Sequence, residues 1–155
     1  MNAVVPRLSA LLAAAVIAVA APAPAEESAL VRVESPHSVA VTLDRLAAAI
    51  EKAGARVFAR VDHAAGAAKV DMTIPDNQVL IFGNPKLGTP VMVAGPSAGL
   101  DLPLKVVAFD EDGQTVMMYR APTAMAAEHG VPADHPSIVK MTGALGKLTA
   151  AAAKP

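Results

Sequence analysis

An amphipathic segment followed at once by an alternating one most constrains how this chain can fold. Four apolar residues recur at the spacing of one helical face before Gly54, namely Leu43, Leu46, Ala47 and Ile50. This pattern predicts a helix over residues 43–53 with Thr42 as its N-cap. Residues 56–62 then alternate as a strand does. Burying the large helical side chains would contribute roughly 1.5 to 3 kcal/mol each, so the helix is expected to pack on a sheet.

The remaining elements are predicted from β-rich runs, turn residues and helical periodicity. Further strands are expected over residues 28–41 (bent at Pro36), 79–82, 104–110 and 115–120, the last two joined as a hairpin. One or two helical turns are expected within residues 64–70. A short helix is expected to begin at Pro90, with Thr89 as its N-cap, and to end at Ala94.

Two helices are predicted to close the domain, over residues 123–129 and 137–148, with an alanine-rich tail after Thr149 that frays. The resulting order is β-α-β-β-(α)-β-β-α-α. It predicts one compact α+β domain in which helices pack on a mixed or antiparallel sheet.

The first 25 residues have the composition of a secretory signal peptide. They carry one charge, Arg7, and an apolar run over residues 8–21, and Ala23-Pro24-Ala25 supplies small residues for cleavage. The run is shorter than the roughly 20 residues that span a bilayer, although an uncleaved anchor is the alternative. The chain is therefore expected to be periplasmic or secreted after cleavage near Ala25.

Composition excludes several classes of function. The 155-residue chain contains no cysteine, which excludes a disulfide scaffold, a thiolate zinc site, an iron–sulfur cluster and a thiol nucleophile. Its formal net charge is -1, so no basic field favours nucleic acid as a partner. No cofactor is predicted.

Three stretches carry a resemblance to a known family. They are residues 58–65 (FARVDHAA), residues 82–90 (FGNPKLGTP) and residues 100–105 (LDLPLK). In order and spacing they resemble the domain of unknown function 302 family, over roughly residues 38–130. The resemblance implies a compact α+β fold that is commonly homodimeric, and it implies no activity. Residues 131–155 extend beyond the resemblance and are interpreted as a helical C-terminal extension of a domain over residues 26–130.

The glycine-rich loop between Gly83 and Pro90 is the most suggestive candidate for a binding site. A nucleotide-binding P-loop requires a lysine directly after its second glycine, whereas Thr89 follows Gly88 here, which excludes that motif. A weaker anion site stays open, in which Lys86, the Thr89 hydroxyl and backbone N–H groups near Gly88 surround a small polar or anionic ligand. Alternatively, the loop only turns the chain and Asn84 caps it.

Asp62 and His63 are a second candidate, because a histidine near its free pKa can exchange protons at neutral pH. Adjacent residues on a strand point to opposite faces, so the two form a pair only if the strand ends between them. The structural alternative is that Asp62 caps the following turn. Ser97 is not favoured as a nucleophile because no G-x-S-x-G turn surrounds it.

Metal sites are weakly indicated. No helical H-x-x-x-H pair occurs, which leaves His63, His129 and His135 as scattered candidates. Six methionines follow the leader and would suit Cu(I), although methionine more often fills gaps in a core. Lys105, Asp101 and Tyr119 complete the candidates, either as an ion pair beside a tyrosine at an interface or as parts of a ligand pocket.

Three classes of function follow from these residues. The leading hypothesis is a non-catalytic exported homodimer that binds a small ligand or a partner through residues 84–90 and the end of the strand at Asp62 and His63. The second is a small hydrolase or isomerase that uses His63, with Lys86 as an electrostatic stabiliser. The third is periplasmic handling of copper or another metal.

Overall fold

The computed structural model describes residues 29–155 and contains one five-stranded sheet in which every pair of neighbouring strands is antiparallel. The strand order is β1-β5-β4-β3-β2. The strands are β1 (Leu30–Ser35), β2 (Arg56–Asp62), β3 (Asn77–Gly83), β4 (Leu104–Glu111) and β5 (Gln114–Arg120). The predicted α+β class, the antiparallel sheet and the β4–β5 hairpin are confirmed.

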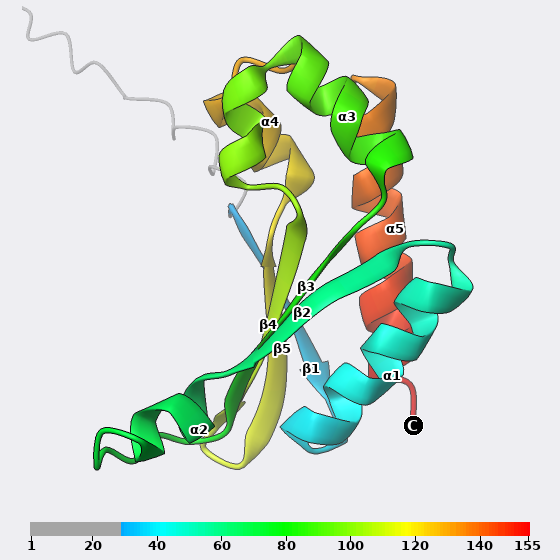
Figure 1. Ribbon diagram of the computed structural model, residues 1–155. Helices are drawn as coiled ribbons and strands as arrows, with labels where there is room; N and C mark the ends of the chain where they lie inside the picture. The colour runs from blue at the N-terminus through cyan, green and yellow to red at the C-terminus, as the bar shows by residue number, and fades with distance from the viewer. Residues whose placement is uncertain (1–28) are drawn as a thin grey trace, which may run out of the picture.

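The helices divide between one face of the sheet and its two ends (Figure 1). The helices α1 (Val39–Lys52) and α5 (Pro136–Ala153) lie side by side on one face. One end of the sheet is capped by α3 (Pro85–Ala94), the 3-10 helix η1 (Pro96–Leu100) and α4 (Pro122–Glu128). The helix α2 (His63–Ala68) projects from the other end. No helix of residues 29–155 is long and apolar enough to span a membrane.

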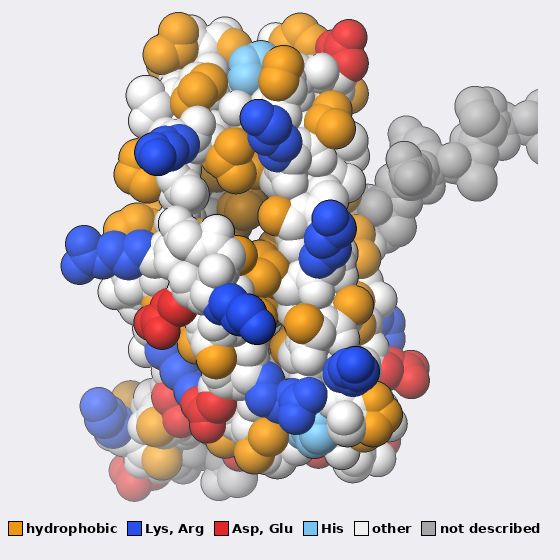
Figure 2. All heavy atoms as spheres, turned by 90° about the vertical axis from the view of Figure 1, so that its right-hand side faces the viewer, with side chains coloured by type: hydrophobic (Ala, Val, Ile, Leu, Met, Phe, Trp, Pro, Cys, Tyr) orange, Lys and Arg blue, Asp and Glu red, His pale blue; other side chains and the backbone are white. Residues whose placement is uncertain are grey.

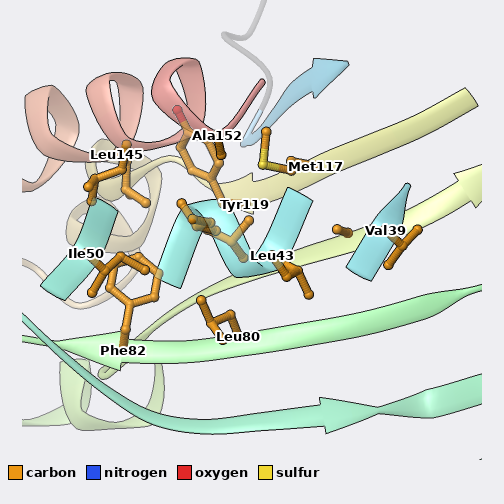
Figure 3. Close-up of a cluster of buried hydrophobic side chains, with 13 residues drawn as sticks. Val39, Leu43, Ile50, Leu80, Phe82, Met117, Tyr119, Leu145 and Ala152 are labelled. Atoms are coloured by element: carbon orange, nitrogen blue, oxygen red, sulfur yellow. The ribbon is translucent and has the colours of Figure 1, made fainter. Parts of the chain in front are cut away.

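The main core lies between the sheet and the pair α1 and α5. Leu43 and Ile50 of α1 face Leu80 and Phe82 of β3, and the helix of Leu145 closes the layer above them (Figure 3). All five side chains are at most 2% exposed. The amphipathic face predicted for α1 is therefore the face that packs on the sheet.

The start of α1 corrects the expected boundary between the first strand and the first helix. The helix begins at Val39, and the N-cap is Ser38, whose hydroxyl accepts the Val41 N–H at 3.4 Å. Thr42, the expected N-cap, lies inside the helix, buried with its hydroxyl 2.7 Å from that of Ser35. Pro36 ends the strand, so residues 39–41 continue as helix rather than as strand.

The start of α3 corrects the expected loop over residues 83–90. Asn84 is the N-cap and accepts the Lys86 N–H at 2.9 Å, and Pro85 occupies the first helical turn. Both are favourable choices at these positions. Pro90 therefore lies inside the helix, where it removes one backbone donor, and does not start it.

The C-terminal tail is helical, contrary to the expected fraying after Thr149. Helix α5 continues to Ala153, and Ala152 is fully buried against the core. Arg45 of α1 donates from Nε to the Ala152 carbonyl at 3.0 Å and from a terminal nitrogen to the Lys154 carbonyl at 2.6 Å. The predicted C-terminal extension is thus helical from Pro136 to Ala153, and it contributes Leu145, Leu148 and Ala152 to the main core. The leader predicted over residues 1–25 lies outside the described residues.

Candidate functional site

A hollow lies on the helix-covered side of the molecule. It encloses about 380 Å³ between the end of α1, helix α3, helix α5 and the adjoining ends of β3 and β4. Figure 2 shows an opening on this face with a hydrophobic floor and several Lys and Arg side chains around it. We call it the apolar cavity; its lining includes Phe58, Phe82, Leu87, Leu102, Leu104 and Met141.

Small residues explain why the helices leave space there. Ala144 of α5 and Gly88 of α3 face the cavity, and a Cβ on Gly88 would only touch Leu102 at 3.8 Å. At Gly83 the backbone runs closer to its neighbours, because a Cβ would lie 3.4 Å from both Phe58 and Pro103. No charged residue belongs to the lining. The cavity therefore suits binding of an apolar group and offers no acid or base to it.

The polar residues of the cavity lie in or beside the first turns of α3. The Asn84 amide is engaged on both sides, since it accepts the Lys86 N–H at 2.9 Å and donates to the Gly54 carbonyl at 3.2 Å. Thr89 is exposed and contributes to the lining, whereas the exposed Lys86 does not. Of the predicted loop residues, Asn84, Gly88 and Thr89 thus border the cavity.

Asp62 and His63 lie far from this cavity. In the β2–β3 ladder, Arg56 pairs with Gly83 and Asp62 pairs with Gln78, so the two sites are at opposite ends of the strands, about 20 Å apart. Asp62 caps α2, accepting the Ala65 N–H at 2.8 Å, and also accepts from Gln78 at 3.2 Å. His63 is exposed at the start of α2. The structure does not bring His63 and Lys86 together.

Asp101, Lys105 and Tyr119 border one common hollow of about 370 Å³, but the expected ion pair between Lys105 and Asp101 is not formed. The Lys105 ammonium donates to the backbone carbonyl of Asp101 at 3.1 Å, and the Asp101 carboxylate is bonded elsewhere. Tyr119 lies in the main core, on the sheet face that α1 and α5 cover. Burial raises the pKa of Tyr119, and the opposing hydrogen bond with Thr149 is weaker.

A hydrogen-bonded chain of Ser97, His129 and Asp101 links η1 to the end of α4. The Ser97 hydroxyl lies 3.0 Å from His129 Nδ1, and His129 Nε2 lies 2.8 Å from Asp101 Oδ2. The His129 side chain is 7% exposed and that of Asp101 is 26% exposed. No local sequence motif predicts these two hydrogen bonds. The three residues are separated by up to 32 positions and meet only because the segment of η1 packs against the end of α4.

The histidines proposed as metal ligands are dispersed. His135 caps α5 by accepting the Ser137 N–H at 3.2 Å, and His129 is bonded to Ser97 and Asp101. Within residues 29–155, no group of three or more potential ligand side chains is placed to hold a metal ion. Met117, Met125 and Met141 are buried in the core, whereas Met72 and Met92 are exposed.

The sheet face opposite α1 and α5 carries no helix in the described part of the chain (Figure 1). Because side chains alternate along a strand, the residues between the core positions point to this face. Val79, Val107 and Met118 pair in register across three strands there and are only partly buried. These three side chains line the second hollow, of about 370 Å³, which Asp101, Lys105, Tyr119 and Arg120 also border.

Comparison with known proteins gives three findings. The chain is 41% identical over 106 residues to the fluoride-specific ion channels FluC 1 of Brucella suis biovar 1 (strain 1330) and of Brucella abortus biovar 1 (strain 9-941). The match covers 68% of this chain and only 42% and 39% of those proteins, so the chain spans about two fifths of the length of the curated relatives it matches.

The fold resembles that of an uncharacterized conserved protein DUF302 from Bacillus stearothermophilus, known from a crystal structure. The TM-score is 0.67 at 19% identity, and the match covers 82% of this chain and 97% of that one. The family model described as domain of unknown function DUF302 matches residues 31–152, which includes α5. By this match over most of its length, the chain belongs to the domain of unknown function DUF302 family.

Proposed function

We propose that this protein is an exported binding module that takes up a small molecule with an apolar body in the apolar cavity. The observation that carries this proposal is a hollow of about 380 Å³ whose lining holds no charged residue. Ligand sites are typically concave and mainly apolar, with a few polar groups that orient the ligand. The apolar run and the small residues of the first 25 residues support export.

The surroundings of the cavity favour a ligand with an acidic end group. The face that carries the opening is rich in lysine and arginine (Figure 2), and Lys86 stands between two lining residues, Pro85 and Leu87. An apolar body in the cavity and a carboxylate outside it match this distribution of charge. A medium-chain fatty acid has that chemistry, whereas a small polar anion would leave the apolar lining unfilled.

Calorimetric titration with decanoate and with decanol tests the proposal. We expect both to bind the wild type, because the alkyl chain supplies most of the buried area. Ala144→Leu would fill part of the cavity from α5, so it is expected to weaken the binding of both compounds by about tenfold or more. Ala150→Leu, at an exposed position of the same helix, is the matched control and should bind as the wild type does.

Lys86→Ala separates the two parts of the proposal. This variant is expected to weaken the binding of decanoate by several-fold and to leave the binding of decanol unchanged, because only the carboxylate would interact with the Lys86 ammonium. Failure of both compounds to bind the wild type would contradict the cavity as a binding site. Equal effects of Ala144→Leu and Ala150→Leu would contradict its location.

The same proposal includes a homodimer, formed through the uncovered sheet face. Residues 63–76, which we call the arm, project beyond the sheet, and no residue of α2 is buried (Figure 1). Val70 and Met72 of the arm are 65% and 62% exposed. An isologous dimer needs surfaces on one chain that complement each other. The exposed Val70 and Met72 of the arm and the row of Val79, Val107 and Met118 on the sheet face would supply its apolar contacts.

A further inference from the structure

We propose that Ser97 is a nucleophile activated by His129, with Asp101 as the positioning residue, and that it accepts the acyl group of small activated esters. The site is separate from the apolar cavity, because none of the three residues belongs to its lining. The proposal rests on the two consecutive hydrogen bonds, at 3.0 Å and 2.8 Å, that join the three side chains.

The hydrogen bonds fix which ring nitrogen can act as a base. An ionised carboxylate only accepts, so His129 Nε2 carries the proton that is donated to Asp101. In the neutral ring, Nδ1 then presents its lone pair to the Ser97 hydroxyl, which is the donor in that bond. This is the arrangement by which a general base takes a proton from a hydroxyl nucleophile.

Exposure is distributed as such a site requires. The His129 ring is shielded from water at 7% exposure, whereas Ser97 is exposed and open to a substrate. Ser97 lines neither the apolar cavity nor the second hollow, so neither of these two hollows would hold a long acyl chain attached to it. The accessible substrates are therefore esters with a small acyl group and a good leaving group.

Close backbone packing holds the nucleophile against the base. Gly95, directly before η1, lies so near the end of α4 that a Cβ there would be 2.6 Å from the His129 carbonyl oxygen and 2.8 Å from Val131. Only glycine permits this approach, which sets the distance between Ser97 and His129. Gly130, at φ +68, then turns the chain away directly after His129.

The reaction balances with an ester and water as the only reactants. Ser97 Oγ attacks the carbonyl carbon as its proton passes to His129 Nδ1. The tetrahedral adduct then breaks the bond to the alcohol oxygen, which leaves with that proton, so that an acyl ester remains on Ser97. A water molecule repeats both steps at the acyl carbon, releases the carboxylic acid and restores the hydroxyl.

The test is the rate of covalent labelling by diisopropyl fluorophosphate, which forms a bond from Oγ to phosphorus and expels fluoride. The full chain is labelled, digested and analysed by mass spectrometry, with the exposed Ser38 as the internal control. We expect Ser97 to react about 100-fold faster than Ser38, which is the lower range of general-base catalysis. We expect His129→Gln and Asp101→Asn to remove most of this advantage.

These measurements separate a nucleophile from a purely structural link between η1 and α4. A structural link predicts lower thermal stability of the variants and no preference for Ser97 in the wild type. A preference below roughly tenfold, or one unchanged by both variants, would overturn the proposal. If His129→Gln fails to fold, two measurements still test whether Ser97 is an activated nucleophile. They are the labelling rate of Ser97 relative to Ser38 in the wild type and the labelling rate of Ser97 in Asp101→Asn. The cavity variant Ala144→Leu should be labelled as the wild type is, so this site and the proposed ligand site can fail independently.

Discussion

Tyr119 is the single tyrosine of the chain and lies in the core between the sheet and α5. Burial raises its pKa above the usual value, while the hydrogen bond with Thr149 acts in the opposite direction and less strongly. The neutral phenol is therefore the form that the folded protein favours. Titration of this residue reports on the core directly, because no other tyrosine contributes to the signal.

Stability is expected to fall in alkaline solution through Tyr119. Below about pH 10 both the folded and the unfolded chain keep the phenol proton, so the contribution is fully present there. As the pH rises past that value the unfolded chain ionises first, and the free energy of unfolding decreases until the folded pKa is passed. The contribution of Tyr119 is measured by urea unfolding of the wild type and of Tyr119→Phe between pH 8 and pH 12, roughly two pH units on either side of the free pKa.

The phenylalanine variant is its own control for the other groups that titrate in this range. Lysines affect both proteins equally, so only the difference between the two stability curves belongs to Tyr119. That difference should change above about pH 10 and stay constant below it. A constant difference over the whole range would show that the phenol keeps an ordinary pKa.

At the scale of single elements, α5 depends on contacts with α1 for its last turn. Its end, a run of four alanines (residues 150–153), lacks large apolar side chains, yet Ala152 is fully buried and Arg45 donates to the carbonyls of Ala152 and Lys154. These carbonyls have no partner within the helix, and a cation at the C-terminal end also favours the helix dipole.

Arg45→Ala is expected to lower the free energy of unfolding by about 1 kcal/mol and to increase fraying of the last turn, because two hydrogen bonds to the terminal carbonyls are lost. Thermal unfolding and hydrogen exchange of the amides near residue 152 measure the two effects. Lys147→Ala, an exposed position on the same helix, is the control. Equal loss in both variants would show that the guanidinium does not cap α5.

At the scale of the whole molecule, the unequal covering of the two sheet faces is the dominant feature. The helices α1 and α5 cover one face, and the described chain supplies nothing comparable for the other (Figure 1). Burial of the uncovered apolar side chains would contribute roughly 25 cal/mol for each Å² removed from water. This burial would stabilise the proposed dimer, in which the arm of one copy packs on the sheet face of the other.

Substitution in the arm is expected to separate the copies. Met72→Asp would place a carboxylate in the proposed interface, so the mass in solution should fall from that of two chains to that of one. Leu100→Asp is the matched control, because Leu100 is 82% exposed on η1 and lies outside the interface. Light scattering over a range of concentrations measures the mass. A monomeric wild type, or identical behaviour of both variants, would contradict the proposed interface.

Regular elements were the most predictable part of the fold. The stripe of Leu43, Leu46 and Ile50 and the alternation in residues 56–62 gave the correct elements because burial of one face repeats with the period of the element. Their boundaries were less predictable. Ser38 caps α1 and Asn84 caps α3, where Thr42 and Thr89 fit the sequence equally well, since a cap depends on which backbone donors are left without partners.

Candidate sites were predicted in part. The apolar cavity is bordered by the predicted residues Asn84, Gly88 and Thr89. The local sequence around them is polar and suggested a polar or anionic ligand. The apolar part of the lining comes from α5 and from residues 102–104, which are distant in the sequence, so the local motif did not reveal it. Asp101 and His129 appeared as separate candidates, and Ser97 was disfavoured. Their hydrogen bonds depend on the contact of Gly95 with the end of α4, which no local pattern encodes.

The sequence by itself determined the class of the domain, its family and the nature of its elements, because periodicity and local motifs are properties of short segments. The tertiary structure alone decided which residues meet: the chain from Ser97 through His129 to Asp101, the cavity between α1, α3 and α5, and the sheet face left uncovered. Such contacts join residues distant in the sequence, and their distances follow from how whole elements pack.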